Sequence, residues 1–165
     1  MHTRSTKLRC NHAYIDGANL DKGTSALGWR VDYQKFYRFL QERYGVRRAY
    51  IFMGYISKYD QIYSRMRDAG FLVRFKDTII TEGSQIKGNC DADLVLTAVR
   101  DAYESIFDAA VIVTSDGDFA SLVAYFREKD RLEMVISPNQ RCSKLITRQS
   151  VPLAYMNRVR EQVSG

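Results

Sequence analysis

Four aspartates stand where apolar runs give way to polar turns, and their carboxylates could do chemistry together. They are Asp16 in YIDGANL, Asp91 in GNCDADLVL, and Asp116 and Asp118 in VTSDGDFASLV. In an open parallel sheet, residues that follow the strands gather at a crevice along the carboxyl edge. If the apolar runs before Asp16 and Asp116 are neighbouring strands, we expect all four carboxylates to meet at that edge.

A cluster of carboxylates needs compensation, because like charges within a few ångströms repel one another and destabilise the fold. A divalent cation with oxygen ligands removes the repulsion, and Mg²⁺ or Mn²⁺ prefers carboxylates and water. The chain has only two histidines, His2 and His12, both near the N-terminus, which disfavours a zinc site. We therefore predict that the four aspartates hold Mg²⁺ or Mn²⁺ and are the catalytic residues, since such ions can activate water for attack on a phosphodiester.

Each acid also has a simpler explanation when it is taken alone. Asp91, Asp116 and Asp118 could each be a helix N-cap or first-turn acid, which stabilises a helix by roughly 1 kcal/mol. It is the set of four that favours a metal site over separate caps.

Three further residues are candidates for substrate binding. Asn19 can orient a ligand or water, or it can be a turn residue in DGANL. Lys87 in QIKGN can contact a phosphate, although a loop lysine is usually just solvated. Ser115 can donate to a neighbouring carboxylate, or it can be an N-cap.

The totals indicate one soluble domain with a basic surface. A chain of 165 residues, 45% of them hydrophobic, is long enough for one sizeable core and short for two. The net charge of +6 favours anionic partners such as nucleic acid, although a plain basic solvated surface would give the same total.

The cysteines and the apolar runs bear on the compartment. Cys10, Cys90 and Cys142 are far apart and form no C-x-x-C pair, so neither a disulfide framework nor a zinc knuckle is indicated. No run approaches the roughly 18 apolar residues that span a bilayer, and no apolar region follows the basic N-terminal residues. We expect a cytoplasmic protein that does not enter a membrane.

Short apolar runs alternate with amphipathic segments, which is typical of a parallel sheet flanked by helices. The predicted strands lie at residues 13–15, 49–56, 71–75, 109–115 and 132–137, and helices are expected at 31–45, 58–70, 91–107 and 118–130. Residues 139–163 predict a helix, a short extended piece and a final helix. The long connection at 76–90 is of a length that is usually functional or mobile.

The helical spacing also predicts which side chains are buried. In the segment 31–45, Asp32 is the expected N-cap and Gly45 the expected stop. In the segment 58–70, which ends at Gly70, we expect one face to lie in the core; its members are Tyr59, Ile62, Tyr63, Met66 and Ala69.

The motifs YIDGANL, KGNCDADLVL and VTSDGDFASLV resemble those of the NYN domain family, in the LabA-type branch of the PIN-like nucleases. The resemblance runs from about residue 12 to the final helix. It implies a PIN-like α/β fold, a Rossmannoid three-layer sandwich whose mostly parallel central sheet of five or six strands is flanked by helices. It also implies metal-dependent ribonuclease activity, with an acidic pocket at Asp16, Asp91, Asp116 and Asp118 and with Asn19 beside them. We expect residues 1–11 to be a flexible N-terminal segment and residues 12–165 to be a single NYN/PIN-like domain.

The resulting hypothesis is a metal-dependent nuclease, most simply an RNA endonuclease, with RNA as its partner. The alternative is a non-catalytic RNA-binding or protein-interaction module that retains the acidic pocket. A haloacid-dehalogenase-like phosphatase would need an acid at Ala18, and a Toprim-type domain would need a glutamate at Asp16. The tyrosine-rich faces of the predicted helices could pair two copies of the chain, so a homodimer is an alternative to a monomer.

Overall fold

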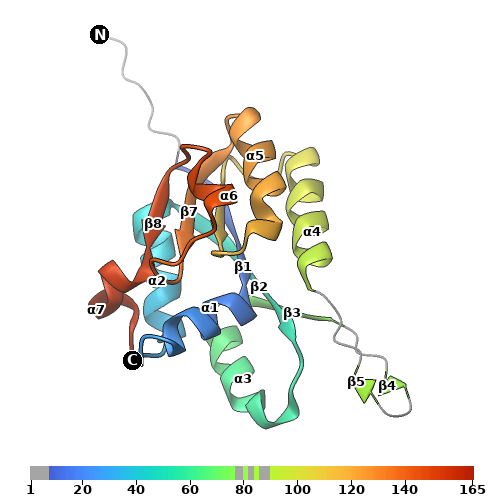
Figure 1. The fold of residues 1–165 in the computed structure, drawn as a ribbon, viewed down its shortest axis with the longest axis vertical. Coiled ribbons are helices and arrows are strands. Elements are labelled where there is room, and N and C mark those ends of the chain that lie inside the picture. The colour runs from blue at the N-terminus through green and yellow to red at the C-terminus, as the bar shows by residue number, and fades with distance from the viewer. Residues whose placement is uncertain (1–7, 77–79, 82–83, 86–89) are drawn as a thin grey trace.

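The computed structural model describes residues 8–76, 80–81, 84–85 and 90–165 (Figure 1). Its central sheet has the strand order β3-β2-β1-β6-β7-β8, and every neighbouring pair is parallel. The strands are β1 Asn11–Asp16, β2 Val46–Gly54, β3 Leu72–Lys76, β6 Ala110–Val113, β7 Leu132–Ser137 and β8 Leu153–Tyr155. A separate antiparallel pair is formed by β4 Ile80–Thr81 and β5 Ser84–Gln85.

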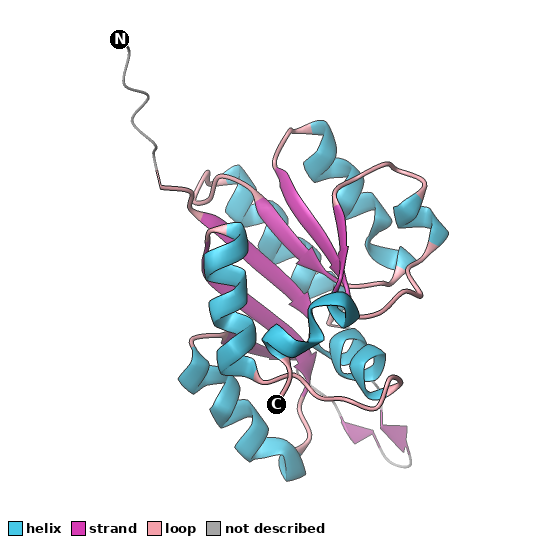
Figure 2. Cartoon of the chain, turned by 90° about the vertical axis from the view of Figure 1, so that its left-hand side faces the viewer, coloured by secondary structure: helices cyan, strands magenta, loops and turns pink. Residues whose placement is uncertain are grey.

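Helices connect the strands of the main sheet and cover both of its faces (Figure 2). The α-helices are α1 Gly17–Ser25, α2 Tyr33–Tyr44, α3 Asp60–Ala69, α4 Asp91–Tyr103, α5 Ala120–Glu128, α6 Lys144–Thr147 and α7 Arg160–Val163. The short 3-10 helices are η1 Ser57–Tyr59, η2 Gly117–Phe119 and η3 Met156–Val159. Within the described residues, no helix combines the length and the apolar character needed to cross a membrane.

Side chains along β1 alternate between two buried cores, because successive residues of a strand point to opposite faces. Ala13 and Ile15 join the core that also contains Phe36 and Leu40 of α2. Tyr14 joins the other core, with residues of α4 and α5 such as Leu94 and Phe126. The three-layer α/β sandwich expected from the sequence is therefore confirmed.

The helix ends follow the local signals in the sequence. The Asp32 carboxylate caps α2 by accepting the backbone N–H of Lys35 at 3.0 Å, and α2 stops at Gly45, whose φ is 64°. Gly70 ends α3 with a φ of 115°. Glycine adopts these left-handed conformations without a Cβ clash, so both predicted stops are confirmed.

Helix α1 and Tyr59 are among the features that differ from the predictions. Helix α1 begins directly after Asp16, in a stretch for which the sequence pattern predicted no helix. Tyr59 was expected in the core, but its exposed fraction is 37%. The reason is that Tyr59 lies in η1, before α3 begins at Asp60, so the 3.6-residue spacing of the helix does not apply to it.

The strand order brings the carboxyl ends of β1 and β6 together. These strands are parallel neighbours, with Ile15 paired to Val113, so Asp16 and Thr114 are the next residues on each strand. The chain leaves β1 for β2 on one side of the sheet and leaves β6 for β7 on the other. This is the topological switch point at which open α/β sheets form their crevice.

Candidate metal centre

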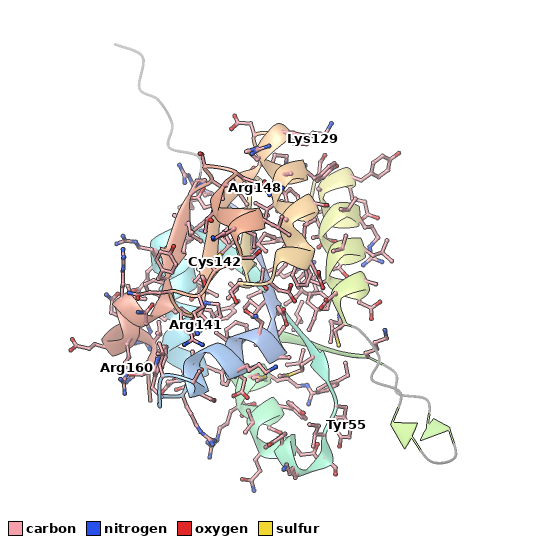
Figure 3. All side chains as sticks on the ribbon, viewed as in Figure 1. Tyr55, Lys129, Arg141, Cys142, Arg148 and Arg160 are labelled. Atoms are coloured by element: carbon pink, nitrogen blue, oxygen red, sulfur yellow. The ribbon has the colours of Figure 1, made fainter. Side chains whose placement is uncertain are left out.

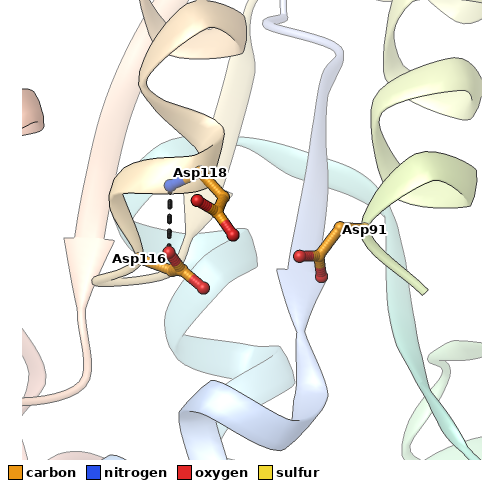
Figure 4. A group of neighbouring side chains, drawn as sticks. All are labelled: Asp91, Asp116 and Asp118. Atoms are coloured by element: carbon orange, nitrogen blue, oxygen red, sulfur yellow. Dashed lines mark hydrogen bonds between the residues drawn. The ribbon is translucent and has the colours of Figure 1, made fainter. Parts of the chain in front are cut away.

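Three carboxylates meet at the switch point, and they come from two segments far apart in the sequence. Asp91 is the first residue of α4, Asp116 is the N-cap of η2, and Asp118 lies within η2. One carboxylate oxygen from each lies within 4.8 Å of the others (Figure 4). Asp91 and Asp116 are half-buried and Asp118 is exposed. The structure thus brings together three of the four predicted aspartates.

Asp16 lies in the same cleft but outside this group of three. The cleft has a volume of about 930 Å³, and Asp16, Asn19, Asp91 and Asp116 line one part of it. The Asp16 carboxylate accepts the backbone N–H of Asn19 at 3.2 Å and the hydroxyl of Thr114 at 3.2 Å.

The pKa of Asp16 is raised from 3.8 to about 6, mainly by burial. The hydrogen bonds from Asn19 and Thr114 lower this pKa, and the charges of Asp91 and Asp116 raise it. The charge repulsion that the sequence predicted between the carboxylates therefore acts on Asp16.

Thr114 joins two of the acids and was not predicted from the sequence. Its hydroxyl donates to Oδ2 of Asp16 and accepts the backbone N–H of Asp116 at 3.1 Å. The side chain is fully buried. The available signal was a polar residue at the end of the apolar run AVIV, where a buried hydroxyl needs hydrogen-bond partners.

Asn19, which follows β1, and Ser115, which follows β6, are hydrogen-bonded to each other. The backbone N–H of Ser115 donates to Asn19 Oδ1 at 2.8 Å, and Asn19 Nδ2 donates to Ser115 Oγ at 3.0 Å. The pair ties the first turn of α1 to the loop after β6, so it positions Asp16 against Asp116. Substrate contact by Asn19 and Ser115 stays a prediction, and Lys87 lies outside the described residues.

The capping explanation holds for some of the acids and does not exclude the cluster. Asp116 Oδ1 accepts the N–H of Asp118 at 2.9 Å, and Asp16 caps α1 in the same manner. Asp91 is not a cap, because the N-cap of α4 is Cys90. A carboxylate has two oxygens with about four acceptor sites, so one capping bond leaves room for a ligand.

The donors suit a hard divalent cation. All three side chains of the group offer carboxylate oxygens, which are the ligands of Mg²⁺ and Mn²⁺, and the group contains no histidine or cysteine. Two of the three are Asp116, the N-cap of η2, and Asp118 within η2, and the third, Asp91, faces them from the start of α4 (Figure 4). The arrangement is compatible with an oxygen-ligand metal site.

Replacing Asp16 by asparagine should stabilise the metal-free protein at pH 8. Because the pKa of Asp16 is higher in the folded chain than in the unfolded one, the ionised side chain opposes folding above pH 6. Below about pH 4 the group is protonated in both states, and the penalty disappears. We expect Asp16→Asn to raise the free energy of unfolding by roughly 1–3 kcal/mol at pH 8, and by much less at pH 4.

Urea denaturation in EDTA at both pH values measures this difference. A loss of stability of equal size at pH 4 and pH 8 would mean that Asp16 acts as a helix cap alone.

The comparisons with known proteins bear on the fold and on the family. A search of curated proteins gave no significant match. The crystal structure of a protein of unknown function from Vibrio parahaemolyticus superimposes with a TM-score of 0.81, covering 99% of this chain and 100% of that one. At 20% sequence identity, this likeness shows the fold alone. The family model of the NYN domain matches residues 13–151, so the chain belongs to the NYN domain family, a family of PIN-like nucleases.

Proposed function

We propose that this protein is a metal-dependent nuclease that hydrolyses phosphodiester bonds in RNA as an endonuclease. The observation that carries the proposal is the meeting of Asp91, Asp116 and Asp118 within 4.8 Å. Two of them, Asp91 and Asp116, line the same cleft as Asp16. An acidic group of this kind attracts a divalent cation and repels a bare phosphate. A bound cation therefore lowers the repulsion that the phosphates of a nucleic-acid strand meet at these carboxylates.

The residues of the chain have distinct parts in the proposed reaction. Asp91, Asp116 and Asp118 hold Mg²⁺ or Mn²⁺, which supplies Lewis-acid stabilisation of the charge that develops on the phosphate. Above pH 6, Asp16 adds a further negative carboxylate beside them. Thr114 and the Asn19–Ser115 pair keep the acids in place, because their hydrogen bonds join the ends of β1 and β6.

The choice of RNA as the substrate rests on the family and on charge. The NYN domain is a PIN-like nuclease family, and the sequence motifs resemble ribonucleases of that family. The net charge of +6 favours a polyanionic substrate, since lysine and arginine contacts to phosphates supply much of the affinity for nucleic acid.

A cleavage assay with a mixed pool of RNA fragments tests the proposal. The purified protein is incubated with the pool in Mg²⁺, in Mn²⁺ and in EDTA. We expect internal cleavage with a metal and none in EDTA, because the acids cannot act without the cation. Binding of RNA without cleavage under all three conditions would contradict the nuclease proposal and favour the non-catalytic RNA-binding module. Cleavage that survives EDTA would mean that a contaminating nuclease is responsible.

A further inference from the structure

The cleft that holds the carboxylates continues as a groove between α1 and the η1–α3 segment. Asp16, Asp91 and Asp116 line one part of it, while Lys22 of α1 and Tyr59 of η1 line another. The whole cavity, at about 930 Å³, is of a size that holds small ligands, for which roughly 300–1,000 Å³ is usual. Any strand bound at the carboxylates would therefore meet this groove.

One wall of the groove is apolar and partly open to solvent. Met53 at the end of β2, Ile56 in the following turn and Tyr59 all line the cavity. Ile56 has an exposed fraction of 50% and Tyr59 one of 37%. Exposed apolar side chains that line a cavity beside polar groups are typical of a ligand site.

The apolar wall is held in place by three hydrogen bonds, two of them part-buried. The backbone N–H of Ile56 donates to the hydroxyl of Tyr63 at 3.0 Å, and this hydroxyl donates to the carbonyl of Gly54 at 3.4 Å. Tyr63 is only 3% exposed, so it anchors the turn to the core. The Tyr55 hydroxyl donates to Asp60 at 2.7 Å and ties the same turn to α3. The wall is therefore formed before any ligand binds.

One lysine side chain lies beside the aromatic ring of the wall, and another lies on α1 opposite. The ammonium nitrogen of Lys58 lies 5.0 Å from the centroid of the Tyr59 ring. Lys22 is exposed and lies five residues after Gly17, which is roughly 7–8 Å along the axis of α1. An aromatic ring with positive charges near it is the arrangement that binds single-stranded nucleic acid, by base stacking and phosphate contacts.

We propose that the groove between α1 and η1–α3 binds one unpaired nucleotide of the substrate strand. Its base lies against Ile56 and Tyr59, and its phosphate is contacted by Lys22. This inference rests on the proposed nuclease function and adds a base-binding subsite beside the carboxylates. A paired base is stacked inside its duplex, so it cannot place its face against Tyr59.

Binding of a fluorescently labelled, unstructured RNA 12-mer tests the groove without any need for cleavage. Anisotropy is measured in EDTA for wild type, Tyr59→Ala, Tyr59→Phe and Lys22→Ala. We expect Tyr59→Ala to weaken binding roughly 5- to 100-fold, as loss of one stacked base does, and Tyr59→Phe to restore it. Lys22→Ala should weaken binding and reduce the slope of log affinity against log salt by about 1. The RNA duplex of the same sequence should bind more weakly than the single strand.

Two matched controls come from exposed positions outside the groove. Tyr103→Ala removes a tyrosine of α4 that is 88% exposed, and Lys129→Ala removes a lysine that lies far from Tyr55 in Figure 3. Both should bind the 12-mer as wild type does. Circular dichroism melts of every variant establish that each one folds.

Several outcomes would overturn the groove as a nucleotide site. They are equal affinities for Tyr59→Ala and Tyr103→Ala, tighter binding of the duplex than of the single strand, or no binding by wild type. The readout is separate from the nuclease test, because it uses no hydrolysis. Metal-dependent cleavage in which Tyr59→Ala leaves KM unchanged would sink the groove while the nuclease stands. RNA binding that is weakened by Tyr59→Ala, in a protein that cleaves no RNA with a metal, would support the groove and contradict the nuclease.

Discussion

Asp91→Asn should lower the rate of metal-dependent RNA cleavage by roughly 100- to 1,000-fold. The substitution keeps the shape of the side chain but removes one of the negative charges that meet within 4.8 Å. Removing one preorganised group that stabilises developing charge costs an enzyme about this factor in other active sites. The bound cation is then held by fewer charges, so more Mn²⁺ should also be needed to reach half of the maximal rate. Single-turnover cleavage over a Mn²⁺ titration measures both effects.

Asp93→Asn is the matched control for this variant. Asp93 also lies in the first turn of α4, so its removal changes the helix-end charge as the loss of Asp91 does, but it is exposed and outside the group of three. We expect it to cleave RNA within about threefold of wild type. Equal activity in the two variants would remove Asp91 from the site, while equal loss in both would point to the end of α4 rather than to a metal ligand.

The strand pattern predicted the sheet because continuous apolar runs are typical of parallel strands that are covered on both faces. The runs before Asp16 and Ser115 became β1 and β6, and the extended piece after Pro152 became β8. Local signals such as Asp32 and Gly45 predicted helix ends, since they act within one turn of the chain. Strands and helix ends depend on residues that are close together in the sequence, so one sequence is enough to predict them.

The details of the site depend on distances across the sheet, which the sequence does not contain. The pattern placed Asp16 with the other acids, but only the packing of α1 and β6 shows that Thr114 and Asn19 bind its carboxylate. Tyr59 was predicted as core because its spacing from Tyr63 matches a helix. The chain forms η1 at that point instead, and this leaves the ring beside the groove.

Gly17→Ala should lower RNA cleavage by roughly 10- to 100-fold and should reduce stability. A Cβ at Gly17 would lie 2.9 Å from Ile51 Cγ2 and 3.0 Å from the carbonyl oxygen of Phe52. The carbonyl cannot retreat, because β2 is hydrogen-bonded between β1 and β3. The first turn of α1 must therefore move outward and carry Asn19 away from Ser115. Displacements of about 1 Å at a catalytic site cost up to about 100-fold in rate.

The stability effect of Gly17→Ala is a balance of two terms. Alanine favours a helix over glycine by about 1 kcal/mol, whereas overpacking a well-filled site costs about 1–3 kcal/mol. Since backbone is one of the contacts, we expect the clash to prevail and urea denaturation to show a net loss. Gly54→Ala is the control for stability, because a Cβ there meets nothing within 4 Å among the described residues. If Gly17→Ala were as stable as Gly54→Ala and as active as wild type, α1 would not be tightly packed against β2, and this packing could not be what positions Asp16.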